Sequence, residues 1–290
     1  MTIKNSKICL GAANFGARYG YKNKKISMKE LKKILIYAKK NNIKFIDTAS
    51  SYKFSEKNIG EAGARGFKII SKLPKIPKRK LNISKWIKNK FKKSLKDLKL
   101  KKIYALLIHN PEDLNNNKNV KEIIKTLNIL LKQNKVEKIG ISVYTINQLE
   151  KYFNIYNFKI VQFPYNIFDQ RIVKSKWHNI FKNRKIEMHA RSIFLQGVIL
   201  NNYNELPKKL KAFNKVISDF TNWSQKNKIS KLEASFRFVY SNKSINKFVI
   251  GFNDLNQLKE IVRLCGKKTK LYKLKPFKIS NSKYLNPQNW

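Results

Sequence analysis

The stretch IYALLIHNPEDLNNNKNVKEIIKTLNILLKQNKVEKIGI, residues 103–141, decides the fold class of this chain. It begins with the apolar run IYALLI at 103–108 and ends with a second short run, EKIGI, at 137–141. Between the two runs, apolar side chains recur at helical spacing at Val120, Ile123, Ile124, Leu127, Leu130 and Leu131. Short apolar runs that alternate with amphipathic helices are typical of successive βα units. The stretch therefore predicts an α/β fold rather than an all-helical or all-β one.

The same alternation extends to both ends of the chain. Eight candidate strands can be counted, at 7–11 (KICLG), 44–47 (KFID), 67–71 (FKIIS), 103–108 (IYALLI), 137–141 (EKIGI), 159–163 (KIVQF), 185–190 (KIEMHA) and 246–251 (NKFVIG). Amphipathic stretches separate them, and two successive helices, at 206–226 and 230–240, are a small departure from strict alternation. Eight βα units in 290 residues match a (β/α)8 TIM barrel, whereas a doubly wound sheet usually has fewer strands. We expect the barrel.

A single domain is predicted, because no linker rich in proline, glycine or serine divides the chain. We expect residues 1–265 to form one barrel and residues 266–290 to form a polar C-terminal tail that ends in an aromatic residue. Two placements of the tail stay open: it folds against the barrel, or it edges the barrel mouth.

A formal charge of +47 follows from 64 lysines and arginines against 17 acidic residues. A hydrophobic content of 42% still supports a substantial core, which excludes a largely disordered polycation. Only eight of the 64 cations are arginine, the residue that most often reads bases through paired hydrogen bonds. The lysines fall on the water-facing sides of the predicted helices. We therefore expect no specific nucleic-acid partner and only weak, salt-sensitive attraction to anions.

The sequence contains no pattern typical of a targeting, membrane or metal-binding segment. It has no run of 18 apolar residues, and the apolar patch near its start is too short and glycine-rich for a signal peptide. A soluble cytoplasmic protein without a membrane partner is expected. The cysteines and histidines do not cluster, which argues against a metal site. They are Cys9, Cys265, His109, His178 and His189.

Polar residues follow three consecutive candidate strands. The second strand ends on Asp47, and Tyr52 lies in the loop behind it. The third strand runs into Lys72 and the fourth into His109. In such a barrel the active site lies at the carboxyl ends of the strands. Each residue alone has an ordinary structural explanation, but their joint placement predicts one catalytic site.

These four side chains suit the reduction of a carbonyl group, given a hydride source. A free tyrosine has a pKa of about 10 and is a poor proton donor at neutral pH. We expect the ammonium of Lys72 to lower the pKa of Tyr52, and Asp47 to keep Lys72 charged. His109 would then orient the substrate oxygen while Tyr52 delivers the proton.

At these positions the chain resembles the aldo-keto reductase family. The matching segments are LGAANFGARYG (10–20), FIDTASSY (45–52), SEKNIGE (55–61), IISKLP (69–74), LLIHNPEDL (106–114), KIGISVY (138–144), VQFPYNIFDQR (161–171), ARSIFLQGVIL (190–200) and FVIGFNDLNQLKE (248–260). The resemblance covers nearly the whole chain and implies the same barrel. It also implies hydride transfer from a bound nicotinamide dinucleotide to an aldehyde or ketone, with Asp47, Tyr52, Lys72 and His109 at the catalytic positions.

The resemblance further implies a set of cofactor-binding residues. No GxGxxG or GxxxxGK sequence is present, so neither the Rossmann nor the P-loop mode of phosphate binding applies. The implied set covers the nicotinamide end, the loop that crosses the pyrophosphate and the adenosine pocket. Its members are Ser142, Gln162, Arg191, Ser192, Leu195, Gly197, Gly251, Asn253 and Gln257.

Three residues depart from the family pattern. Arg191 stands where many relatives stack a tyrosine on the nicotinamide, although a guanidinium plane can also stack. Lys53 replaces a glycine that is common after the catalytic tyrosine. Asn253 stands where a basic residue is frequent, which weakens the case for a cofactor 2′-phosphate. We expect NADPH as the cofactor, with NADH also possible.

Other function classes stand beside a reductase of a small-molecule carbonyl substrate. A nucleotide-binding regulatory or scaffold protein would keep the fold without turnover. A Schiff-base enzyme would use Lys72 but leave Asp47 and Tyr52 without roles. The complete set of four polar side chains favours the reductase. Candidates for lining its substrate mouth are Phe15, Tyr19, Phe54 and Phe168.

Overall fold

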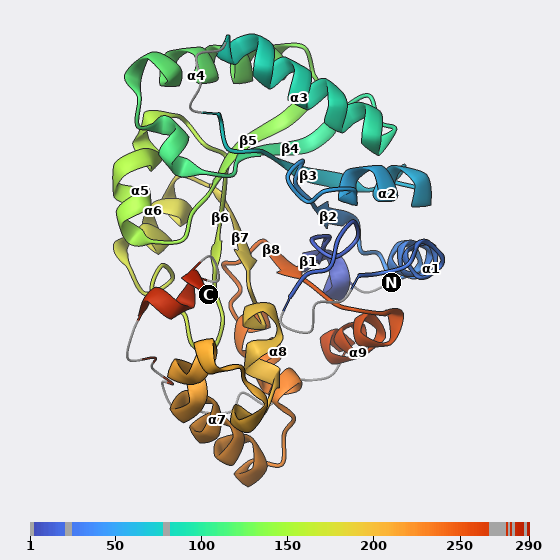
Figure 1. The fold of residues 1–290 in the computed structure, drawn as a ribbon, viewed down its shortest axis with the longest axis vertical. Coiled ribbons are helices and arrows are strands. Elements are labelled where there is room, and N and C mark those ends of the chain that lie inside the picture. The colour runs from blue at the N-terminus through green and yellow to red at the C-terminus, as the bar shows by residue number, and fades with distance from the viewer. Residues whose placement is uncertain are drawn as a thin grey trace.

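Eight parallel strands close into a barrel in the computed structural model of this chain (Figure 1). The structure describes residues 3–20, 25–77, 82–266, 277, 279, 282–286 and 289–290. The strands are β1 Ile8–Gly11, β2 Phe45–Asp47, β3 Lys68–Leu73, β4 Ile103–Ile108, β5 Val136–Ser142, β6 Ile160–Pro164, β7 Glu187–Arg191 and β8 Lys247–Ile250. Each strand pairs with its neighbour in sequence, and β8 pairs with β1, with Val249 opposite Cys9. The predicted (β/α)8 TIM barrel is confirmed, and every candidate strand overlaps an observed one.

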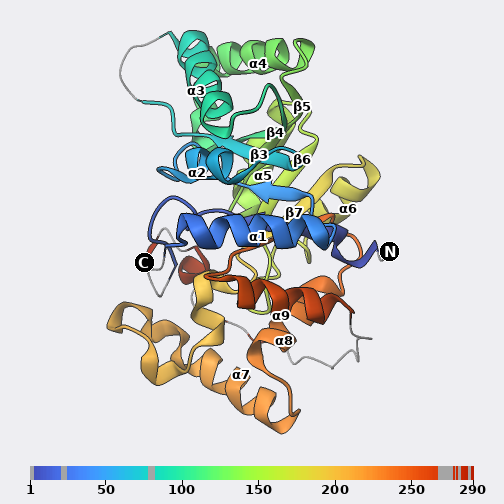
Figure 2. The same ribbon diagram turned by 90° about the vertical axis from the view of Figure 1, so that its right-hand side faces the viewer.

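Helices alternate with the strands and cover the barrel from outside (Figure 2). The α-helices are α1 Met28–Lys40, α2 Ser55–Ala62, α3 Ile83–Leu98, α4 Asn117–Lys132, α5 Ile146–Tyr152, α6 Lys176–Asn183, α7 Asn214–Lys226, α8 Lys231–Tyr240 and α9 Leu255–Gly266. The 3-10 helices are η1 Ile3–Lys7, η2 Pro111–Leu114, η3 Phe153–Ile155, η4 Leu195–Leu200, η5 Tyr203–Glu205, η6 Lys208–Phe213 and η7 Ser282–Leu285. The helix predicted at 230–240 is α8, whereas the pattern at 206–226 divides into η6 and α7. In both views α7 lies at one end of the molecule, beyond α8.

None of the helices in the described part of the chain is long and apolar enough to cross a membrane.

Side-chain caps fix the beginning of several helices. Ser27, Asn82, Asn116, Ser175 and Ser230 each accept a hydrogen bond from a backbone N–H in the first turn of α1, α3, α4, α6 and α8. Such a cap contributes about 1 kcal/mol to stability. Because each of these helices begins behind a loop, the caps also help to hold the loops in place.

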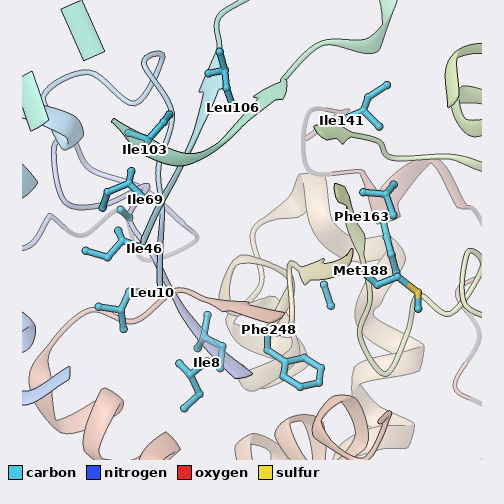
Figure 3. Close-up of a cluster of buried hydrophobic side chains, with 14 of the residues drawn as sticks. Ile8, Leu10, Ile46, Ile69, Ile103, Leu106, Ile141, Phe163, Met188 and Phe248 are labelled. Atoms are coloured by element: carbon cyan, nitrogen blue, oxygen red, sulfur yellow. The ribbon is translucent and has the colours of Figure 1, made fainter. Parts of the chain in front are cut away.

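The strand residues alternate between two apolar layers, as expected for a closed barrel. Leu10, Ile46 and Leu106 belong to the larger cluster, which includes helix residues and is drawn in part in Figure 3. Their neighbours Cys9 and Ile70 belong to a smaller cluster contributed only by strands. The barrel interior is therefore a packed core on which polar groups at the strand ends can be held rigidly.

A polar network lies at the amino-terminal end of the barrel strands. Glu187, the first residue of β7, accepts hydrogen bonds from Tyr104, at 2.5 Å, and from Lys138, and lies 3.0 Å from Nε2 of His189. Burial by itself raises the pKa of a carboxyl group. Here the hydrogen bonds from His189, Lys138 and Tyr104 outweigh burial and lower the pKa of Glu187 to about 2.

We expect Glu187→Gln to destabilise the fold at neutral pH much more than at acidic pH. The carboxylate stabilises the fold above its unfolded-state pKa of about 4.3 and loses this contribution as the pH falls toward about 2. Urea unfolding at about pH 7 and about pH 3 measures the difference in free energy of unfolding between wild type and variant. Glu150→Gln, which removes only an exposed ion pair with Lys176, is the matched control. An equal difference at both pH values would contradict this role of Glu187.

A third apolar cluster joins C-terminal residues to η6 and α7. Phe277 and Leu285 are buried in it beside Phe213 and Phe220, and the ring of Trp290 contacts Phe213 edge-on at 5.8 Å. These tail residues therefore pack against the helices beside the barrel. The segment 267–276 of the predicted tail lies outside the described residues, and the division of the chain at residue 265 stays a prediction.

Candidate active site

A cavity of about 370 Å³ opens at the carboxyl ends of the strands. Each of the eight strands contributes a lining residue, from the strand itself or from the loop that follows it. The predicted site residues that line the cavity are Asp47, Tyr52, Lys72, His109, Ser142, Gln162, Arg191, Ser192, Gly197, Gly251, Asn253 and Gln257. Leu195 is the exception, because its side chain is buried in the third apolar cluster. The structure thus brings together residues from positions 47 to 257 of the sequence.

A buried ion pair between β2 and β3 forms part of the cavity wall. The Nζ atom of Lys72 lies 2.5 Å from Oδ1 of Asp47, and the two side chains are only 1% and 5% exposed. Gln162 donates from Nε2 to the other carboxylate oxygen at 2.6 Å. Lys72 also donates to the carbonyl oxygen of Thr48 at 3.0 Å. These contacts offset the cost of removing two charges from water, which is several kcal/mol for each ion.

Gln162 keeps one polar atom without a partner among the described residues. Its Oε1 atom is buried and accepts no hydrogen bond. A buried carbonyl oxygen left in this state costs about 1–3 kcal/mol, so it marks a place for a donor from a ligand.

Tyr52 and His109 lie beside the ion pair with their rings in contact. The ring centroids are 5.9 Å apart, and the planes meet edge to face at 80°. Nζ of Lys72 is 5.4 Å from the centre of the Tyr52 ring. The hydroxyl of Ser51 lies 3.3 Å from Nδ1 of His109, and Nε2 has no partner among the described residues. A proton-carrying phenol and an imidazole nitrogen therefore border the same space.

Backbone packing holds the loop that carries Tyr52. A Cβ atom at Gly16 would lie 2.1 Å from the backbone nitrogen of Ser55, so the loops after β1 and β2 meet backbone to backbone. The Ser55 hydroxyl also donates to the carbonyl oxygen of Ala12 at 2.8 Å. Lys53 adopts a φ of 47°, a left-handed conformation that favours glycine. This conformation gives a physical reason for the glycine that is common at this position in the family.

The pKa of Tyr52 moves in the direction opposite to the predicted one. Desolvation of its hydroxyl and the carboxylate of Asp47 raise this pKa above its ordinary value, and the positive charge of Arg191 opposes them. The prediction that Lys72 lowers it was wrong, because the ammonium of Lys72 is paired with Asp47. Desolvation, together with the charges of Lys72 and Arg191, lowers the pKa of His109 to about 3. At neutral pH the tyrosine is therefore a protonated phenol and the histidine is uncharged.

Arg191, at the end of β7, is stacked on Tyr144. Its guanidinium carbon lies 3.8 Å from the centre of the tyrosine ring. Nη2 donates to the carbonyl oxygen of Val143 at 3.1 Å, and Nη1 donates to the Ser192 hydroxyl at 3.3 Å. The sequence reasoning did not single out Tyr144, although it follows the end of β5 by two positions, where a barrel places functional side chains.

The loop after β7 has an unusual backbone. Ser192, Leu195, Gln196 and Gly197 all have positive φ, with values of 57°, 46°, 55° and 95°. Residues other than glycine that are held in this region cluster at functional sites. The backbone N–H groups of Leu195 and Gly197 donate hydrogen bonds within turns, to the carbonyl oxygens of Ser192 at 2.9 Å and of Phe194 at 2.8 Å.

The loop at 251–257 is held by its own polar side chains. Oε1 of Gln257 accepts from the backbone N–H of Asn253 at 2.8 Å, and Oδ1 of Asp254 accepts from that of Gln257 at 2.9 Å. Asn14 donates to the carbonyl oxygen of Phe252 at 2.6 Å and so joins this loop to the one after β1. The contribution of Asn14 to the cavity wall was also missed, since an isolated asparagine carries no recognisable signal.

Of the four aromatic residues proposed for the mouth, only Tyr19 is among the residues that line the cavity. Phe15 is buried in the larger apolar cluster and Phe168 in the third one instead, since an uncharged ring gains more from full burial. Phe54 is 61% exposed and faces solvent. Among the described residues, no group of three His, Cys, Asp or Glu side chains could hold a metal ion.

A comparison with protein families gives a match that covers most of the chain. The model of the aldo/keto reductase family matches residues 7–275. The chain belongs to the aldo/keto reductase family. A comparison with curated proteins finds no match.

Solved structures of aldo-keto reductases share the fold. AKR11C1 from Bacillus halodurans, in its holo form, has a TM-score of 0.73 and 17% identity, over 91% of this chain and 88% of that chain. PA4992 from Pseudomonas aeruginosa has a TM-score of 0.64 and 18% identity, over 89% of each chain. At these identities the similarity establishes the barrel architecture and leaves the substrate open.

Proposed function

We propose that this aldo/keto reductase reduces an aldehyde or a ketone to an alcohol, with NADPH or NADH as the hydride donor. The observation that carries the proposal is the contact between Tyr52 and His109 in a cavity bordered by the buried pair of Lys72 and Asp47. A protonated phenol next to a neutral imidazole is suited to a carbonyl oxygen that gains a proton. The four catalytic assignments rest on this geometry and on membership of the family.

The residues that line the cavity are suited to a nicotinamide dinucleotide. The unpartnered Oε1 atom of Gln162 can accept a hydrogen bond from a carboxamide N–H, and the hydroxyl of Ser142 lines the same cavity. The loop from Ser192 to Gly197, with Leu195 anchored in apolar packing, would hold the pyrophosphate. Gly251, Asn253 and Gln257 would hold the adenosine end. When bound there, the reduced cofactor supplies the hydride that the carbonyl carbon accepts.

The side chains of this chain would position the carbonyl group and supply the proton. His109 is neutral and donates from Nε2 to the carbonyl oxygen, provided that Nδ1 accepts from the Ser51 hydroxyl. Tyr52 transfers its proton to the same oxygen as negative charge develops there. The positive charge of Arg191 stabilises the phenolate that remains. Asp47 and Gln162 hold Lys72 and its surroundings in place.

A panel of aldehydes and ketones, tested with NADPH and with NADH, decides between a reductase and a scaffold. Loss of the absorbance of the reduced nicotinamide is expected with at least one class of carbonyl compound. Tight cofactor binding without turnover of any compound would instead support the nucleotide-binding scaffold. The cytoplasmic location stays a prediction.

NADPH is expected to bind with only a modest advantage over NADH, and this advantage should shrink as the salt concentration rises. The 251–257 loop contains no cation and one carboxylate, Asp254, so attraction of a 2′-phosphate depends on the overall positive field. That field is screened beyond about 8 Å at physiological ionic strength. Arg191→Ala should affect the two cofactors equally, because Arg191 is assigned to the nicotinamide end of the cofactor and would not contact the 2′-phosphate.

Fluorescence titrations of both cofactors at low and high salt, with wild type and Arg191→Ala, measure these affinities. A large NADPH preference that salt does not reduce would show that a basic residue outside the loop, such as Lys259 or Arg263, reaches the phosphate.

A further inference from the structure

Arg191 carries the one charge in the described wall of the cavity that has no opposite charge beside it. The ionised residues among those lining the cavity are Asp47, Lys72 and Arg191. Asp47 and Lys72 neutralise each other at 2.5 Å, and His109 is uncharged at neutral pH. Among the described residues, no carboxylate lies within ion-pair distance of Arg191. The described wall therefore has a net charge of one positive unit.

The guanidinium is held in place by contacts that leave it open to a ligand. Stacking on Tyr144 at 3.8 Å fixes its plane, and the bonds to Val143 and Ser192 use two of its N–H groups. An arginine side chain has five N–H donors, so three of them remain available to a ligand. A partly buried cation with no opposite charge beside it carries a desolvation penalty, and binding of an anionic ligand would offset this penalty.

The surroundings of Arg191 are rich in hydrogen-bond donors. The phenols of Tyr19, Tyr52 and Tyr144 line the same cavity, as does the imidazole of His109. The charge of Arg191 acts on the titration of Tyr19, Tyr52 and His109, so these groups are its electrostatic neighbours. The one carboxylate in the described wall, Asp47, is already satisfied on both oxygens. This donor-rich composition is suited to an anion rather than to a cation or an apolar tail.

We propose that Arg191 binds a carboxylate of the substrate, so that the preferred substrates are small carbonyl compounds that also carry an acid group. This inference rests on the proposed function, because it concerns the substrate of the same cavity. The guanidinium would accept the carboxylate with two parallel N–H···O bonds. The carbonyl group of the same molecule would then lie toward Tyr52 and His109. Arg191 would in this way select the substrate and orient it.

A matched pair of compounds tests the proposal. 4-Formylbenzoate and 4-formylbenzamide have nearly the same shape and differ in charge, and their alcohols are 4-(hydroxymethyl)benzoate and 4-(hydroxymethyl)benzamide. Calorimetric titration of the two alcohols into the protein, without cofactor and with NADPH, measures binding without turnover, because an alcohol cannot accept the hydride of the reduced cofactor. We expect wild type to bind the carboxylate about 10 to 100 times more tightly than the amide. The same ratio is expected in kcat/KM for the two aldehydes.

Three variants locate the source of the preference. Arg191→Met should remove it, and Arg191→Lys should reduce it, because an ammonium lacks the paired donors. Arg184→Met is the matched control, since Arg184 directly follows α6, is exposed, and contacts Asn154 and the ring of Phe153 away from the cavity wall. It should keep the full preference. Circular dichroism tests whether each variant folds. If Arg191→Met does not fold, a reduced preference for the carboxylate over the amide in Arg191→Lys supports the proposal, and an unchanged preference overturns it.

Equal binding of the two alcohols by wild type would overturn the proposal, as would a preference that survives in Arg191→Met. An Arg191→Met variant that loses affinity for NADPH but keeps the carboxylate preference would assign the cation to the cofactor instead. Failure of the proposed function gives a different result. In that case the carboxylate would bind preferentially, but neither aldehyde would be reduced.

Discussion

Tyr52→Phe should lower turnover by about 10² to 10⁴ while leaving the affinity for the cofactor nearly unchanged. The change removes one oxygen atom, which is the proton donor, and leaves the ring that contacts His109. Proton transfer stabilises the transition state and not the bound ground state, so the loss should fall on kcat. Initial rates with an aldehyde or ketone that the wild-type enzyme reduces, together with a cofactor titration, measure the two effects separately.

Tyr203→Phe is the matched control for this experiment. Tyr203 is 49% exposed and lies outside the cavity wall, so the same atomic change there should leave kcat unaltered. Turnover like that of wild type in Tyr52→Phe would remove Tyr52 as the acid.

Lys72→Met should destabilise the fold by about 3–5 kcal/mol at neutral pH. The variant leaves the carboxylate of Asp47 buried with Gln162 as its hydrogen-bonding side chain and with no cation against it. Asp47→Asn combined with Lys72→Met removes both charges, so the double variant should be more stable than Lys72→Met alone. Urea unfolding monitored by circular dichroism compares the free energies of unfolding.

Lys93→Met provides the comparison with an exposed pair. Lys93 lies 2.7 Å from Asp97, but its side chain is 68% exposed, so its loss should cost less than about 1 kcal/mol. If Lys72→Met were no more costly than Lys93→Met, the pair of Lys72 and Asp47 would not be the stabilising element described here.

The strands and the set of residues around the cavity could be predicted because both depend on local sequence pattern. A run such as IYALLI at 103–108 is apolar throughout, since both of its faces are buried, and the structure has the strand at the same residues. His109 directly follows this run, so its position at a strand end could be inferred without a structure. The same reasoning brought Asp47 and Lys72 to the same end of the barrel.

The electrostatics of the site could not be predicted in this way. The direction of the Tyr52 pKa depends on desolvation and on the engagement of Lys72 by Asp47, and both are properties of three-dimensional packing. The stacking of Arg191 on Tyr144 joins residues 47 positions apart whose pairing no local pattern specifies. Leu195 belongs to a recognisable motif, but its side chain is buried in an apolar cluster with residues of η6 and α7, and no local pattern specifies that burial.

The pKa values of His109 and Tyr52 are shifted in opposite directions, so the site keeps one protonation state over a wide range of pH. The pKa of His109 falls to about 3, and that of Tyr52 rises above its ordinary value. Neither proton carrier therefore changes its charge between mildly acidic and mildly alkaline conditions. As the pH falls below about 4.3, the stability that the Glu187 carboxylate contributes at the far end of the barrel begins to be lost, before the pH reaches the pKa of His109. Loss of activity in this interval would therefore report unfolding of the barrel, with Tyr52 and His109 still in their working protonation states.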